Sequence, residues 1–102
     1  MEFTAAAVVE ALRSHADPAA YPQRHYHGDG GVLGVRMGTL FEVAKGFTAL
    51  PLAEVDRLLD FTPYEPRMAA FCVLDFKARN AKLPADERAA AYELYLRRHD
   101  RP

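Results

Sequence analysis

The chain has 102 residues, of which half are apolar and 26% are charged; this composition is typical of one globular domain and excludes a disordered tail or a fibrous repeat. Its 13 basic and 14 acidic side chains give a net charge of −1, which excludes a polyanion-binding protein that is basic over its whole surface and leaves room only for a local patch. The single cysteine, Cys72, excludes an internal disulfide and a zinc site built from several cysteines, and its apolar surroundings predict a small buried side chain.

The N-terminal segment carries no signal for export. Met1 to Thr4 lacks the basic region, the apolar core and the cleavage site of a secretory signal. The chain also has no apolar run of about 18 residues, the minimum for a membrane-spanning helix. We therefore expect a soluble, cytoplasmic protein without a membrane partner.

The first half of the chain predicts three helices. Apolar residues recur at helical spacing after the N-cap residue Thr4 and predict a helix over about 5–15. Asp17-Pro18 is a second start signal, for a short helix near Tyr21. A third helix is predicted over 37–46, with Gly46 as its stop.

The second half predicts three more. Pro51 precedes a helix of about ten residues. The next runs over 64–79 and is apolar nearly all round, so we expect it to be buried between neighbours. Thr62-x-x-Glu65 at its start resembles a capping box, but Pro66 would lie too deep in that register, so we expect the helix to begin near Tyr64 with Pro66 in its first turn. In the last helix, after Leu83-Pro84, Ala85, Ala89, Tyr92 and Leu96 form the predicted apolar stripe, and Ala91 and Tyr95 widen it.

These patterns predict one all-α domain over residues 1–102 with about six helices, because no segment alternates apolar and polar residues for long enough to form a strand. Short, proline-marked turns join the helices into antiparallel hairpins. Such hairpins form either a small bundle or a stack of two-helix repeats, and the internal sequence similarity is too weak to choose between them.

The segment from Tyr26 to Arg36 holds four of the six glycines and is the main candidate for a functional loop. His25, His27 and Asp29 could ligate a metal, but they lack a third histidine nearby, so we expect polar loop residues and no metal. A dinucleotide fingerprint fails at Leu33, where it needs glycine, and the phosphate-loop motif is absent. We expect no cofactor.

Charged residues elsewhere suggest two further sites. Asp75 lies in the apolar helix, where an ion pair with Arg79 or with a neighbouring helix is more common than catalysis. Basic residues form two clusters that could contact phosphates, although basic helix ends are also common because cations suit the macrodipole. The clusters are Lys77, Arg79 and Lys82, then Arg97, Arg98 and Arg101.

The order of several motifs resembles the N-terminal part of the AlkD-like DNA alkylation repair proteins. The motifs are Asp17-Pro18, Tyr26 before the glycine turn, Leu33-Gly34-Val35-Arg36, the run from Tyr64 to Ala70, Tyr92-x-x-Tyr95-Leu96 and His99-Asp100-Arg101. The resemblance implies a short α-solenoid of HEAT-like repeats that holds double-stranded DNA by its backbone. It also implies a glycosylase activity on alkylated purines and places Tyr26 and Arg36 beside the lesion cleft.

The chain departs from the family pattern where the chemistry is expected. It ends at Pro102, before the segment that supplies the family's tryptophan and carboxylate, and contains no tryptophan. Gly38 and Phe41 replace a common proline and a common basic residue. We therefore expect a truncated DNA-binding module without a catalytic residue. Two alternatives remain. One is a protein-interaction module that seats a partner or a second copy on its C-terminal helix pair, through Tyr92, Tyr95 and Leu96; the other is an active glycosylase that uses Tyr26, Arg36 and Asp75.

Overall fold

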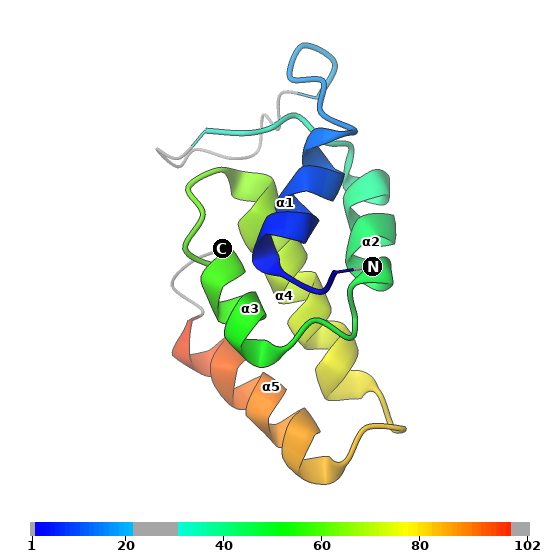
Figure 1. Cartoon of the computed structure of the whole chain (residues 1–102), viewed down its shortest axis with the longest axis vertical. Helices are drawn as coiled ribbons and strands as arrows, with labels where there is room; N and C mark the ends of the chain where they lie inside the picture. The colour runs from blue at the N-terminus through cyan, green and yellow to red at the C-terminus, as the bar shows by residue number, and fades with distance from the viewer. Residues whose placement is uncertain (1, 22–30, 99–102) are drawn as a thin grey trace.

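The computed structural model describes residues 2–21 and 31–98, and these two ranges form five α-helices and no strand (Figure 1). The helices are α1 (Ala5–Arg13), α2 (Met37–Gly46), α3 (Leu52–Leu58), α4 (Tyr64–Arg79) and α5 (Ala85–Arg97). The predicted all-α class is thus confirmed for this part of the chain.

The expected helix after Asp17-Pro18 is only a single turn. The Asp17 carboxylate accepts the N–H of Ala20 at 3.2 Å, and the Asp17 carbonyl accepts the N–H of Tyr21 at 2.9 Å. Asp17 therefore caps this turn as its sequence position suggests, but residues 18–20 form a turn and not a helix. The described residues consequently contain five helices instead of about six.

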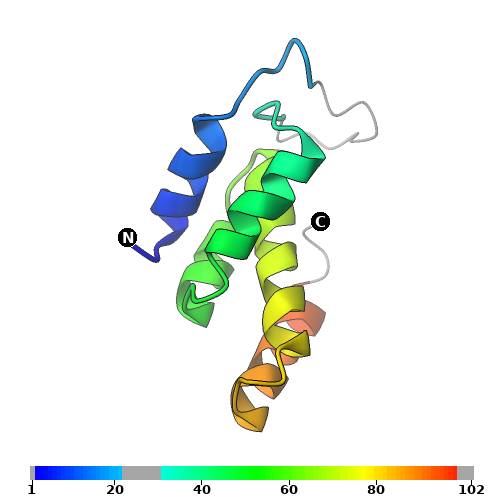
Figure 2. The same ribbon diagram turned by 90° about the vertical axis from the view of Figure 1, so that its right-hand side faces the viewer.

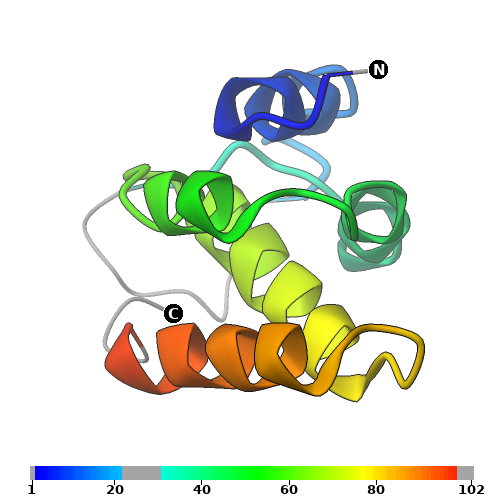
Figure 3. The same cartoon turned by 60° about the horizontal axis from the view of Figure 1, so that its bottom comes forward.

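The central element is α4, which packs against all four other helices. In Figure 3, α1 lies on one side of the molecule and α5 on the opposite side, with α2, α3 and α4 between them. Figure 2 shows α1 and α2 towards one end of the long axis and α5 towards the other. The buried side chains of α4 include Ala69, Ala70, Val73 and Leu74, which confirms the expectation from its apolar sequence. Cys72, on the same helix, is half-buried against this core, and burial together with Asp75 raises its pKa to about 11.

The shorter helices begin at signals that the sequence carries. The Thr4 hydroxyl accepts the N–H of Ala7 at 3.1 Å and so caps α1, whose Val8 and Leu12 are fully buried. Pro51 precedes α3, in which Val55 and Leu58 are fully buried. No helix in residues 2–21 and 31–98 is long and apolar enough to span a bilayer.

The orientation of α5 differs from the prediction. Its buried residues are Ala91, which the sequence predicts at the edge of the stripe, and Leu94, which it does not; the centre of the predicted stripe, Ala85, Ala89, Tyr92 and Leu96, is exposed. Both faces of this helix are apolar, so periodicity alone could not decide between them. The rotation is fixed by Arg98, one turn after Leu94.

Arg98 joins the end of α5 to α3 through two ion pairs. Its guanidinium donates to the carboxylate of Asp56 and, at 2.5 Å, to that of Asp60. The hydrogen bond to Asp60 is the main reason that the pKa of Arg98 is raised above the ordinary value of an arginine. Because Asp56 and Asp60 lie one turn apart, both can reach one guanidinium only when α5 turns its Ala91 and Leu94 face inward.

Two substitutions on α5 test this orientation. Leu94→Ala, at a position 3% exposed, should lower the free energy of unfolding by about 2–5 kcal/mol because it leaves a cavity in the core. Leu96→Ala, at a position 50% exposed, should change it by less than about 1 kcal/mol. Urea denaturation followed by circular dichroism measures both, and a larger loss for Leu96→Ala would contradict this packing.

Candidate functional site

Residues 31–36, which we call the strap, cross the N-terminus of α4 and lead into α2. The strap begins with the carbonyl of Gly31, which accepts the N–H of Tyr64 at 3.0 Å. Gly31 and Gly34 have φ angles of +77° and +85°, a region that side-chain-bearing residues rarely adopt. The glycines of the functional loop predicted from sequence are thus used here to let the backbone turn over a helix end.

The side chain of Glu65, in the first turn of α4, anchors the strap. It is fully buried and accepts three backbone N–H groups, from Leu33 at 2.7 Å, Gly34 at 2.9 Å and Val35 at 3.1 Å. Hydrogen bonds to a carboxylate are stronger than those between neutral groups, and a buried charge requires such partners. The position of Glu65 in the first turn of α4 also suits a negative charge.

Gly34 joins the strap to the turn at Asp17 and Pro18. The Gly34 carbonyl accepts the N–H of Asp17 at 2.6 Å. A Cβ atom on Gly34 would lie only 2.3 Å from the Cα of Pro18, so no larger residue fits without movement of the backbone. Three sequence signals, Asp17-Pro18, the glycine segment and the start of α4, therefore meet at one junction.

The strap ends at Arg36, the N-cap residue of α2. No side chain caps this helix, and its first turn has no acidic residue. The first intrahelical acceptor is the Arg36 carbonyl, which takes the N–H of Leu40 at 2.9 Å. The preceding amide groups, of residues 37–39, therefore remain available to a ligand.

The side chain of Arg36 lies beside Gly38, in the first turn of α2. Arg36 is exposed, and a Cβ atom built on Gly38 would be 3.0 Å from one of its guanidinium nitrogens. A guanidinium beside the positive end of a helix dipole is an arrangement that favours an anion such as a phosphate group. Lys45 is also exposed and lies seven residues, or two turns, after Gly38 on the same side of α2; no sequence motif marks it as a site residue.

The first basic cluster lies where α4 ends. Lys77 is half-buried and lines a hollow of about 350 Å³ together with Glu87; burial lowers its pKa, which Glu87 partly opposes. Arg79 is ion-paired with Asp75, as the sequence predicted. Lys82, in the turn before α5, is exposed.

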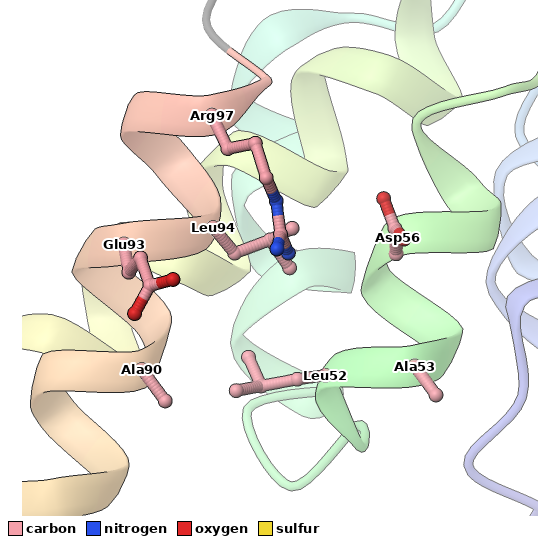
Figure 4. Close-up of a pocket in the computed structure, with 7 residues that line it drawn as sticks. All are labelled: Leu52, Ala53, Asp56, Ala90, Glu93, Leu94 and Arg97. Carbon is pink, nitrogen blue, oxygen red and sulfur yellow. The ribbon is translucent and has the colours of Figure 1, made fainter.

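The second basic cluster lies at the other end of α5. Arg98 is held by Asp56 and Asp60, whereas Arg97 points into the space between α3 and α5 (Figure 4). That space is a hollow of about 220 Å³, also lined by Asp56 and Glu93. A helix of this length separates the two clusters by about 20 Å, so they do not form one patch.

The remaining expected site residues do not converge in the described part of the chain. Asp75 is exposed and ten residues beyond Glu65 on α4, about 15 Å further along the helix axis. Tyr26 and Arg101 lie outside the described residues, as do the histidines of the metal alternative. Within the two described ranges, no three metal-binding side chains come together.

The fold and this junction define an all-helical protein with a strapped, uncapped helix N-terminus. A family model described as DNA alkylation repair enzyme matches residues 8–101. The chain therefore belongs to the DNA alkylation repair enzyme family, which confirms the resemblance seen in its motifs. Searches of curated proteins and of solved structures found no significant match.

Replacement of Glu65 by glutamine tests its role in the junction. A neutral amide oxygen accepts more weakly, and its NH₂ group would face backbone donors, so Glu65→Gln should lower the free energy of unfolding by about 2–4 kcal/mol. Glu42→Gln, on the exposed side of α2, is the matched control and should cost less than about 0.5 kcal/mol. Equal losses in urea denaturation would show that the strap does not depend on this carboxylate.

Two glycine substitutions separate backbone strain from steric conflict. Gly31→Ala places a side chain at positive φ with no atom within 4 Å and should cost about 1–2 kcal/mol. Gly34→Ala adds the conflict with Pro18 and should cost at least about 2 kcal/mol more. Thermal or urea unfolding measures the difference, and similar costs would mean that the Asp17-Pro18 turn does not pack on the strap.

Proposed function

We propose that this protein binds double-stranded DNA in the cytoplasm through the phosphate backbone, as a DNA-binding module of alkylation repair. The observation that carries the proposal is the N-terminus of α2, where the Arg36 guanidinium lies beside Gly38 in a first turn that no side chain caps. Family membership supplies the substrate class, since the matching family is described as DNA alkylation repair enzyme.

The strap makes this site suitable for tight contact. Arg36 follows directly on Val35, which is fully buried and bonded to Glu65, so the backbone at the site is ordered before a ligand arrives. A planar guanidinium can donate two parallel hydrogen bonds to one phosphate, and amide groups can complete its coordination. Pre-organisation of this kind reduces the entropy lost on binding.

Other cations contribute unequally in this proposal. Lys82 and Arg97 are exposed and make no ion pair with any described residue. Arg79 would have to exchange Asp75 for a phosphate, and Arg98 would have to leave two carboxylates. We therefore assign supporting phosphate contacts to Lys82 and Arg97, assign weaker ones to Arg79 and Lys77, and assign none to Arg98.

The arrangement of the helices is compatible with HEAT-like repeats, in which α4 and α5 form one antiparallel pair and α2 and α3 form the preceding layer. The contacts of α4 with both α2 and α5 support it. We propose that this chain alone binds without excising a base, because Glu65 is buried under the strap and Asp75 is engaged with Arg79. Protein-dependent release of a methylated purine from alkylated duplex DNA, followed by chromatography, would contradict this part of the proposal.

Arg36→Gln tests the phosphate site. Loss of one phosphate contact should weaken binding to a fluorescent DNA duplex and reduce the slope of log K against log salt concentration by about 0.9. Arg57→Gln removes an exposed arginine that is paired with Glu54 on α3, so the net charge changes equally but binding should hardly change. Fluorescence anisotropy at several salt concentrations measures both variants. Wild-type binding that is absent or insensitive to salt, or equal losses in the two variants, would overturn the proposal.

A further inference from the structure

The outer face of α5 is apolar and uncovered by any described element. Figure 3 shows α5 along one side of the molecule, with the other helices on its inner side only. The outward residues are Ala85, Ala89, Tyr92 and Leu96, and the exposed fractions of Tyr92 and Leu96 are 57% and 50%. Their spacing of four, three and four residues places them in one straight row, the pattern of a helix that packs against another helix.

The side chains of this row differ in size between its two halves. Its N-terminal half carries two alanines and its C-terminal half carries Tyr92 and Leu96. In an antiparallel pair of identical helices, Ala85 would lie opposite Leu96 of the second copy, and Ala89 opposite Tyr92 of the second copy. Each large side chain then meets a small one, which allows close packing along the whole row.

The charges beside the row match in the same register. Asp86 is in the first turn and exposed Arg97 is in the last. Each follows a member of the row by one position and so lies on the flank towards α3; Arg97 lines the hollow there with Asp56 and Glu93 and would turn its guanidinium outward to meet a second copy. In an antiparallel pair the same flanks of the two helices meet, so Asp86 faces Arg97 of the second copy, and the symmetric contact repeats it. A parallel pair would instead bring Tyr92 against Tyr92 and Leu96 against Leu96 of the second copy and would place Asp86 and Arg97 at opposite ends of the interface.

The opposite flank adds a third match. Arg88 and Tyr95 lie on the side of the row towards α4, where Tyr95 packs edge-to-face on Phe71 with ring centroids 5.6 Å apart. The antiparallel register places Arg88 close to Tyr95 of the second copy, an arrangement that permits a cation–π contact. Tyr95 is 43% exposed, so part of its ring remains available.

We propose that the outer face of α5 binds a second copy of this chain as an antiparallel helix pair with two-fold symmetry. The size and charge matches are self-complementary, which a site for an unrelated partner does not require. One helix of about 20 Å buries less area than a standard interface, so the dimer is weak and depends on protein concentration.

Sedimentation equilibrium over a wide range of protein concentration, without DNA, tests whether the outer face of α5 forms a dimer. Wild type should pass from monomer to dimer, and Tyr92→Asp should remain monomeric because it places a charge in the apolar row. Phe41→Asp changes an aromatic residue of similar exposure, 47%, on α2 and should dimerise like wild type. A wild-type monomer at all concentrations, or equal effects of both substitutions, would overturn the proposal.

Charge exchange tests the register. Asp86→Arg alone and Arg97→Asp alone each create two like-charge contacts in the proposed dimer and should self-associate on the order of tenfold more weakly than wild type. In an equimolar mixture of these two variants, every contact again joins opposite charges, so a heterodimer should form with near wild-type affinity. A mixture no stronger than either variant alone would refute the antiparallel arrangement. Because DNA is absent from these measurements, their outcome is independent of the proposed phosphate site.

Discussion

The buried carboxylate of Glu65 is the acceptor on which the arrangement of the N-terminal half depends. It receives three consecutive backbone N–H groups of the strap, so one side chain fixes a segment that has no regular secondary structure. The strap in turn sets where α2 begins and holds the turn at Asp17 through Gly34. Because Glu65 belongs to the central helix α4, the junction is tied to the hydrophobic core.

Several basic side chains of this protein form ion pairs with carboxylates of the same chain. Arg98 joins α5 to α3, Arg79 pairs with Asp75, and Arg57 pairs with Glu54. Arg36, at the start of α2, is exposed and makes no ion pair with any described residue. A chain with net charge −1 can therefore present a local site for phosphate without a basic surface overall. Arg36 is suited to phosphate binding in this account because the strap holds it at the uncapped start of α2.

The sequence predicts most helices well because their apolar periods and start signals are local. It predicts the ion pair between Asp75 and Arg79 for the same reason, since one helical turn separates the two residues. It fails for Glu65, treated only as part of a capping box, because its partners are amide groups about 30 residues earlier that no side-chain pattern reveals. It also fails for the face of α5, because both faces are apolar and the deciding contact, from Arg98 to Asp56 and Asp60, is distant in sequence.

The most direct test of this account is a titration of the ¹⁵N-labelled protein with a short DNA duplex, followed by the amide resonances of residues 37–39. If the strap presents the start of α2 to phosphate, these resonances should shift early in the titration, and the shifts should diminish as salt is added. DNA-dependent shifts confined to other parts of the chain, with residues 37–39 unchanged, would contradict the account.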